Sequence, residues 1–408
     1  MSFLKLKFFP FGALSLILAL AAGPAAADAG FRIGVVTDGF ASQSETTIFE
    51  DYEGARALVK LYGAAEEGGL IRHLVYPTNF VDEEDKVIDT IVSLADDPLI
   101  KVVVVSQAVP GTAEAFRRLR EKRPEILLLA GEAHEDPPDI AAVADLAVNA
   151  DFIAQGYLIP YSAKELGARN LVHISFPRHL GYETISRRLA IMSQACADLG
   201  LGFAQEEAPD PKSGVGPEAA KLFIKEKFPE WLKKYGPETA FFCTNDAQTE
   251  PLIRQIAELG GIFVEADVPS PLMGYPEAFE LDLKDVVDDW PEILRRLEAA
   301  AARHNALGRL GTWAHSLAYC QTAGLAEFGK LITEGQAKLT DTRKLLESFR
   351  KFSPGGNWNG TYFMDTQTGK PIRNYFLIYQ DTYILGRGYL GVADIDIPEK
   401  YTLIGIRK

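Results

Sequence analysis

The sequence is poor in cysteine. Cys196, Cys243 and Cys320 are the three cysteines among its 408 residues. An odd number allows at most one disulfide within the chain, and their spacing matches no metal-binding motif. We expect them to behave as small buried hydrophobic residues, and the sequence leaves open whether any two of them pair.

Three motifs that identify common enzyme classes are absent. No G-x-G-x-x-G follows the first predicted strand, and no G-x-x-x-x-G-K-[ST] occurs in the chain. The G-x-S-x-G elbow of serine hydrolases is missing as well. The dinucleotide and P-loop interpretations therefore fail, no cofactor is expected, and no nucleophile is identified together with its base.

Excess positive charge and long hydrophobic runs are also missing. The formal net charge is −14, from 42 Lys and Arg against 56 Asp and Glu. An acidic protein is repelled by phosphate backbones and anionic lipids, so nucleic acid is not expected as a partner. Beyond residue 27, no apolar run reaches the ~18–20 residues that span a bilayer.

The first 27 residues have the pattern of an export signal. Lys5 and Lys7 precede an apolar run over residues 8–22, and three alanines at 25–27 form a small-residue cleavage site. We expect cleavage near Ala27 and a periplasmic protein with no stable membrane insertion after cleavage.

Apolar, strand-like runs alternate with helical patterns in the first part of the chain. The runs cover residues 31–37, 72–76, 101–105 and 126–130, and helical spacing of apolar residues appears at 48–61 and 87–94. Strands that alternate with helices predict βαβ units around a parallel sheet. Nearly continuous apolar strands indicate that both faces of the sheet are covered.

The same pattern restarts near residue 150. New strand-like runs cover residues 170–175, 202–205, 239–243 and 262–264. We therefore expect an α/β protein of two Rossmann-like lobes joined by a hinge, with the first lobe at 28–150 and the second at 151–275. Parts of 276–335 and 336–408 are expected to join the first and second lobes, respectively. Residues 375–379 and 382–385 are predicted to form a hairpin.

Polar residues follow the predicted strands of the first lobe. In open parallel sheets, ligands bind outside the carboxyl ends of the strands. His134 stands beside carboxylates, but it lacks the spacing and the histidine partner of a zinc site, so no metal is expected. Ser44 also suits a helix N-cap. The first-lobe ligand candidates are Asp38, Phe40, Gln43, Ser44, Gln107, Glu132 and His134.

The second lobe offers similar loops after two of its strands. Arg178 can clamp a carboxylate or phosphate at two points, or lie on the surface near a helix start. Asn245 or Asp246 can bind the ligand or cap the helix that follows. Phe40, Tyr275 and Trp358 can stack on a flat ligand, although core packing is the favoured role for each. The second-lobe ligand candidates are Phe176, Arg178, His179, Asn245, Asp246 and Tyr275.

Several segments resemble those of known exported proteins. The strand and loop from residue 33, the run 52–55 and the sequence 244–246 resemble type I periplasmic binding proteins. Four segments, 107–112, 134–137, 175–179 and 208–211, are similar to the DUF3798 family of exported proteins. Gly274 and Tyr275 stand where sugar receptors often have Gly-x-Asp, and no Asp follows here.

The resemblance implies a receptor that captures a small polar molecule in a cleft between the lobes. Lobe closure around the ligand presents a new surface to a membrane partner. That partner is an ABC permease in most such receptors and a membrane sensor in others. The mature chain is expected to be a monomer and not an enzyme. The alternatives are a ligand-sensing module for a chemoreceptor or kinase, and an exported enzyme that uses the same cleft.

Overall fold

The computed structural model describes residues 30–39 and 48–406. The predicted export signal and three ligand candidates, Phe40, Gln43 and Ser44, lie outside these residues.

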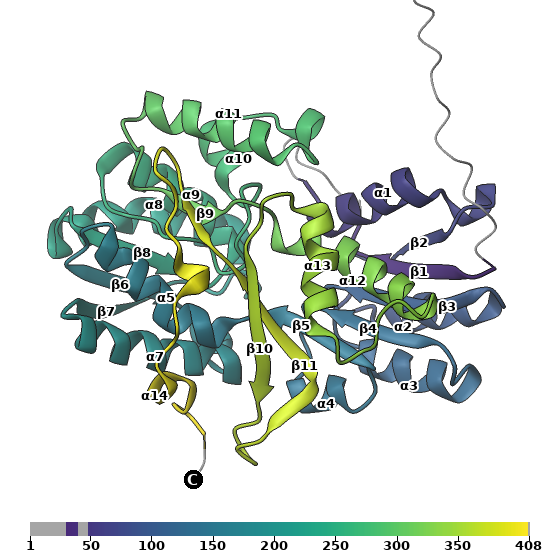
Figure 1. The fold of residues 1–408 in the computed structure, drawn as a ribbon. Helices are drawn as coiled ribbons and strands as arrows, with labels where there is room; N and C mark the ends of the chain where they lie inside the picture. The colour runs from purple at the N-terminus through teal and green to yellow at the C-terminus, as the bar shows by residue number, and fades with distance from the viewer. Residues whose placement is uncertain (1–29, 40–47, 407–408) are drawn as a thin grey trace, which may run out of the picture.

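A seven-stranded sheet forms the centre of the first lobe (Figure 1). Its order is β2-β1-β3-β4-β5-β11-β10, and β10 is the antiparallel member. The strands are apolar along most of their length because helices cover both faces, as in β3, where six of seven side chains are buried. The strands are β1 (Arg32–Thr37), β2 (Ile71–Val75), β3 (Ile100–Ser106), β4 (Leu127–Gly131), β5 (Leu146–Ala150), β10 (Trp358–Met364) and β11 (Pro371–Gln380).

Helices from both ends of the sequence cover this sheet. α12 packs against α1, α13 and β3. Glycines permit this close approach: a Cβ on Gly54 of α1 would lie 2.6 Å from the carbonyl oxygen of Tyr319 in α12. The helices are α1 (Glu50–Tyr62), α2 (Glu84–Val92), α3 (Thr112–Lys122), α4 (Pro137–Ala141), α12 (Leu317–Thr333) and α13 (Thr342–Phe352).

The second lobe repeats the same strand order on a smaller scale. Its sheet contains β6 (Asn170–Ser175), β7 (Gly202–Glu207) and β8 (Thr239–Cys243) in the parallel order β7-β6-β8. Parallel bridges from Ala240 to Ile262 and from Phe263 to Leu310 extend it. The helices are α5 (Phe152–Glu165), α6 (Pro177–Leu180), α7 (Glu183–Leu199), α8 (Gly216–Tyr235), α9 (Asp246–Leu259), α10 (Tyr275–Phe279) and α11 (Trp290–Arg303).

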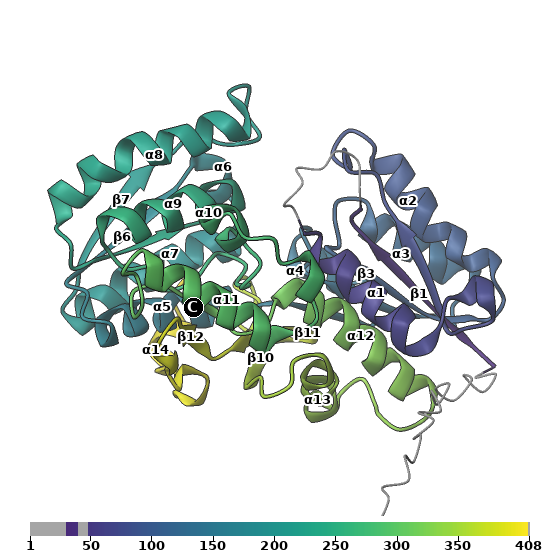
Figure 2. The ribbon, with the colours of Figure 1, turned by 90° about the horizontal axis from the view of Figure 1, so that it is seen from above.

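Three crossings of the chain connect the lobes within the described residues. The chain passes from β5 to α5, from β9 (Gly311–Trp313) to α12, and from β11 to β12 (Thr382–Ile384). β9 and β12 form a small antiparallel sheet with β13 (Gly388–Tyr389). Figure 2 shows the lobes side by side, with these C-terminal elements at the junction. α14 (Glu399–Thr402) contacts α5 and α7 of the second lobe.

The two-lobe α/β fold with parallel sheets is confirmed. The predicted hairpin at 375–385 is wrong, because β11 pairs with β5 and β10, whereas β12 pairs with β9 and β13. β11 has no free edge for β12, since β5 and β10 pair with it on both sides, and the carboxylate of Asp381 accepts bonds from the amides of Gly391 and Val392 instead. Residues 336–408 contribute to both lobes.

Candidate ligand-binding site

The carboxyl ends of β3 and β4 carry two residues with unusual backbones. Gln107 has φ 41° and Glu132 has φ 48°, in the left-handed region that non-glycine residues seldom adopt. Backbone hydrogen bonds hold both turns, from Ala108 to Gly131 at 2.9 Å and from Glu132 to Val148 at 2.9 Å. Such strained residues concentrate at functional sites, and both were ligand candidates from the sequence.

Acidic side chains from both lobes gather at this edge. Glu132 experiences repulsion from Asp51 and Glu50 of its own lobe and from Asp246 and Asp267 of the second lobe. Asp38 is repelled by Asp51 and Glu50. The lobes therefore face each other through a group that we call the carboxylate cluster, consisting of Asp38, Glu50, Asp51, Glu132, Asp246 and Asp267.

Burial and mutual repulsion raise the pKa values of several carboxyl groups in this cluster. Burial, then Asp51 and Glu50, raise the pKa of Asp38 to about 8. Burial raises the pKa of Glu50 to about 7 and that of Asp51 to about 6. Burial and the neighbouring carboxylates hold the pKa of Glu132 well above its usual range. At neutral pH the cluster therefore holds protons that exposed carboxyl groups would have lost.

Hydroxyl groups fix two of these carboxylates. The hydroxyl of Ser270 donates to Glu50, which connects the loop after residue 264 to the start of α1. The hydroxyl of Thr322 in α12 donates to Asp51 at 2.9 Å and lies 2.6 Å from the hydroxyl of Ser106 in β3. The first turn of α1 is thus held between α12 and the sheet.

Several buried polar atoms at this edge have no hydrogen-bond partner. They include one carboxylate oxygen each of Asp38 and Glu132, and the hydroxyl of Tyr76, whose side chain is 2 % exposed. The hydroxyl of Tyr76 lies near the cluster. Burial raises its pKa most, and the charges of Asp38, Asp51 and Glu132 raise it further. In α9 of the second lobe, two residues after Asp246, Gln248 is also fully buried with both atoms of its amide unpartnered. Unpartnered buried groups are costly, so they indicate a bound polar molecule or water.

Arg188 supplies a buried positive charge in the second lobe. It is 0 % exposed, donates to the carboxylate of Asp267 and gives a second bond of 2.9 Å to the amide oxygen of Gln155. Its guanidinium lies 4.6 Å from the ring of Phe152 and 4.8 Å from that of Phe242. The positive charge of Arg188 is therefore already paired with Asp267.

Aromatic rings flank the cluster on both lobes. Tyr76, Phe80 and His134 follow one another with ring centroids 6.1 Å apart in each pair. On the second lobe, Phe176 and His179 have centroids 4.2 Å apart. The surrounding protein, and then repulsion from Lys212 and His179 across the lobes, lower the pKa of His134 to about 4, although its side chain is exposed to solvent. Burial also lowers the pKa of His179, and both rings are neutral at pH 7.

Asn245 and Asp246, two ligand candidates at the start of the helix after β8, have different roles. The side chain of Asn245 accepts a bond from the Ala247 amide at 3.0 Å and so caps α9. Asp246 faces the carboxylate cluster, where surrounding protein and then Asp267 raise its pKa to about 7, although water still reaches it. Of this pair, Asp246 remains a ligand candidate.

Three other candidates are engaged elsewhere. Arg178 makes two bonds to Asp210, of 2.7 and 2.8 Å, so its guanidinium is not a free anion clamp. The hydroxyl of Tyr275 donates to the Gly311 carbonyl at 2.7 Å inside the second lobe. The indole of Trp358 donates to Ser353 at 2.7 Å and packs against Phe349. Tyr275 and Trp358 are core residues, as the favoured sequence interpretation had them.

Sequence reasoning missed part of this site. The rule that loops after strands carry ligand residues would have found Asp267, three residues beyond the predicted strand at 262–264. Glu50 and Asp51 look like favourable charges in the first turn of a helix. Tyr76 and Arg188 gave no local signal, because their positions depend on tertiary packing.

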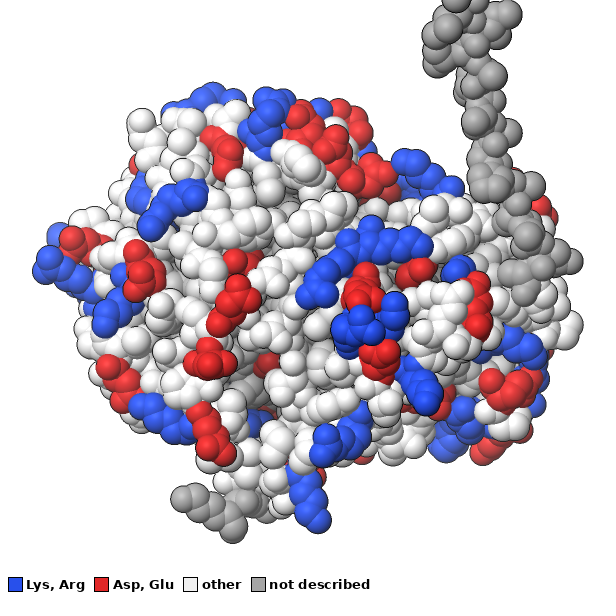
Figure 3. Space-filling model, viewed as in Figure 1, with Lys and Arg blue, Asp and Glu red and all other residues white. Residues whose placement is uncertain are grey.

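The described residues contain no group of three or more His, Cys, Asp or Glu side chains suited to a metal ion. Cys196, Cys243 and Cys320 are all buried and unpaired. In the part of the chain that the structure describes, no helix is long and apolar enough to cross a membrane. On the face seen in Figure 3, charges of both signs are interspersed.

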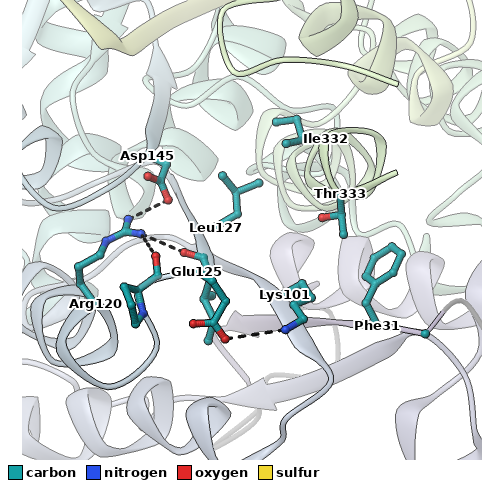
Figure 4. Close-up of a pocket in the computed structure, with 11 residues that line it drawn as sticks. Phe31, Lys101, Arg120, Glu125, Leu127, Asp145, Ile332 and Thr333 are labelled. Carbon is teal, nitrogen blue, oxygen red and sulfur yellow. Dashed lines mark hydrogen bonds and ion pairs between the residues drawn. The ribbon is translucent and has the colours of Figure 1, made fainter. Parts of the chain in front are cut away.

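A pocket at the opposite edge of the first sheet is a weaker candidate (Figure 4). It lies at the amino ends of β3 and β4. Its charged side chains are already paired: Arg120 donates to Asp145 at 2.8 Å, and Lys101 lies 3.8 Å from Glu125. No buried polar atom of its lining residues lacks a partner among those described. The carboxyl edge is therefore the better site.

The fold and site define the class of protein. A solved "Putative transcriptional regulator" from Clostridium difficile 630 has a TM-score of 0.72 at 24% identity, covering 87% of this chain and 99% of that one. A sugar ABC transporter structure from Actinomyces odontolyticus has a TM-score of 0.50 at 12% identity, covering 76% and 86% of the two chains. The chain has the periplasmic binding protein type I fold.

The sequence comparisons give the family. The model of DUF3798, a protein family of unknown function, matches residues 31–311, and the chain belongs to this family. A second family model matches residues 322–404. An uncharacterized protein of Treponema pallidum (strain Nichols) is 42% identical over 214 residues, which are 52% of this chain and 97% of the relative. Another from the same organism is 44% identical over 183 residues, or 44% and 80% of the two chains.

Proposed function

We propose that this protein is an exported receptor that captures a small polar molecule between its two lobes and delivers it to an ABC-type permease. The observation that carries the proposal is the set of unpartnered buried groups where the lobes meet. Asp38, Tyr76 and Glu132 have free hydrogen-bonding atoms on the first lobe, and Asp246 and Asp267 face Glu132 from the second. A ligand that bonds to both lobes favours the closed arrangement, because it stabilises only the state in which both sets are within reach.

The architecture supports binding by lobe closure. Ligands of open α/β sheets bind beyond the carboxyl ends of the strands, and here those ends face each other from two sheets of the same strand order. Three chain crossings act as a natural hinge, since a few residues at element ends can absorb a domain rotation. Asp38, Gln107, Glu132, His134, His179 and Asp246 form our set of ligand contacts.

Export and the membrane partner rest on two further observations. The first 27 residues have the pattern of an export signal. The sugar ABC transporter structure from Actinomyces odontolyticus shares the fold, which makes a permease the first partner to test. Cell fractionation with an antibody against the protein tests the compartment, and cytoplasmic retention of the full-length chain would contradict it.

Mass spectrometry tests ligand capture directly. Native spectra of the freshly purified mature protein should contain a small-molecule adduct, and denaturing extraction should release it. Re-binding of the extract should decrease the radius of gyration measured by X-ray scattering, as the lobes close. Glu132→Gln should reduce re-binding at least tenfold, whereas the matched control Glu125→Gln, at the opposite sheet edge, should not. Chemical conversion of the extract by the protein would instead favour the enzyme alternative.

A further inference from the structure

The charges facing the site are strongly unbalanced. Six carboxyl groups meet there, and the buried guanidinium of Arg188 is already paired with one of them, Asp267. Arg178 is held by Asp210. Lys212, whose charge acts on His134 from the second lobe, is exposed. His73, His134 and His179 have lowered pKa values and are neutral at pH 7.

The free atoms on the first lobe are mostly acceptors. Asp38 and Glu132 each have one carboxylate oxygen that is buried and without a donor. In the ionised form that a bound cation favours, a carboxylate only accepts hydrogen bonds, so its partner in the ligand must donate. The hydroxyl of Tyr76, which faces the same carboxylates, can accept or donate. An ammonium group offers three donors together with the positive charge that the cluster lacks.

The aromatic rings at the site also suit an ammonium group. Phe80 is half-buried and stands between the rings of Tyr76 and His134. Phe176 and His179 provide a second aromatic surface on the other lobe. A cation within about 6 Å of an aromatic face is attracted to it, which is how aromatic pockets recognise organic ammonium ions. Carboxylates and rings together favour an organic cation over an inorganic one.

We propose that the ligand captured between the lobes is a small organic cation, whose charged nitrogen bonds to Asp38 and Glu132. This inference rests on the proposed function and adds the chemical class of the ligand. A neutral polyol is the competing class, since protonated carboxyl groups can also bond to hydroxyls. The two classes differ in what they do to the protons of the cluster.

Binding of a cation should release protons. The carboxylate cluster is partly protonated at pH 7 when no ligand is bound, because burial and repulsion raise its pKa values. A positive charge beside Asp38 and Glu132 favours their ionised forms, so protons leave for the buffer. A neutral hydroxylated ligand adds no charge and should release few.

Matched pairs of probes separate the classes. Purified mature protein is tested with putrescine against 1,4-butanediol, and with glucosamine against glucose, by thermal unfolding and by calorimetric titration in buffers of different ionisation enthalpy. We expect at least one amine to raise Tm, to release protons and to bind at least tenfold tighter than its hydroxyl counterpart. Glu132→Gln and Asp38→Asn should each weaken that binding at least tenfold, and Glu125→Gln should leave it unchanged. Circular dichroism confirms that each variant is folded.

Three results would overturn the proposal. If a hydroxyl probe binds as tightly as its amine, or if the molecule extracted from the native protein is neutral or anionic at pH 7, the ligand is not a cation, while the receptor function stands. If the protein retains no molecule and none of the four probes raises Tm, both the cation inference and the receptor function are contradicted.

Discussion

Arg188 and Asp267 form an ion pair inside the second lobe, where the guanidinium also lies over the rings of Phe152 and Phe242. Arg188→Met should leave Asp267 as an unpaired buried charge and decrease the free energy of unfolding by about 3–5 kcal/mol. Urea titration measures this change. The matched control is Arg169→Met, because the pair of Arg169 with Glu238 is exposed and its loss should cost less than about 1 kcal/mol. Equal effects of the two variants would contradict the structural role of Arg188.

The close approach of α1 and α12 gives a second prediction. Gly54→Ala places a methyl group about 2.6 Å from the carbonyl oxygen of Tyr319, so the two helices must separate. We expect a loss of about 1–3 kcal/mol in the free energy of unfolding, as for other overpacked interiors. Gly214→Ala is the control, since nothing lies within 4 Å of its added Cβ, and its effect should stay within about 0.5 kcal/mol. A neutral Gly54→Ala would mean that the helices are not in tight contact.

Glu265 gives a prediction about pH. Burial raises its pKa to about 7 from an ordinary value of 4.5, against the lowering effect of bonds from Thr382 and Trp313. The folded state binds the proton of Glu265 more tightly than the unfolded state does. The stabilisation from this protonated group is therefore complete below pH 4.5 and is lost as pH rises through 7. Relative to the natural protein, Glu265→Gln should therefore gain about 1–3 kcal/mol of stability between pH 4.5 and pH 8.

The comparison at each pH must be between the variant and the natural protein. His173 acts in the opposite direction, because burial and then Arg188 lower its pKa to about 3. The contribution of His173 to the free energy of unfolding is present above its ordinary pKa of 6.5 and is lost as pH falls toward 3. Subtracting the free energy of unfolding of the natural protein at each pH removes the effect of His173 and leaves the effect of Glu265. A difference that does not change with pH would show that Glu265 ionises normally in the folded state.

Arg178 gives a prediction about binding. Its guanidinium is occupied by Asp210 and its side chain is 40% exposed. Arg178→Gln should therefore change the affinity for the extracted ligand less than twofold and the stability by less than about 1 kcal/mol. Calorimetric titration of the extract measures the affinity. A tenfold loss would restore Arg178 as an anion clamp and would argue against a cationic ligand.

The sequence predicted the parts of this protein that depend on local pattern. Apolar runs such as 101–105 identified the buried parallel strands, and their spacing identified two lobes. The rule that ligands bind after strands led to Asp38, Glu132 and Asp246, which the structure brings together in the carboxylate cluster. These residues come together because strand order places consecutive loops at one edge of a sheet.

Other features depend on residues far apart in the sequence. Glu50 and Asp51 are buried, and their hydrogen-bond donors, Ser270 and Thr322, come from distant parts of the chain. The guanidinium of Arg178 is engaged because Asp210 is near it in space, which its position after a strand does not reveal. The run 382–385 looks like the second strand of a hairpin until its pairing with β9 is known. Local patterns do not encode such partners.

The pairing of β5 with β11 has a consequence for how the chain reaches its native state. Asn149 and Tyr375, which share a hydrogen bond between these strands, are 226 positions apart. While a growing chain lacks its C-terminal part, β5 has an unpaired edge that invites association with other chains. The first lobe is therefore completed last, although most of it is made first, and contacts of such long range slow folding. A chain shortened before residue 371 should aggregate, however well its second lobe folds.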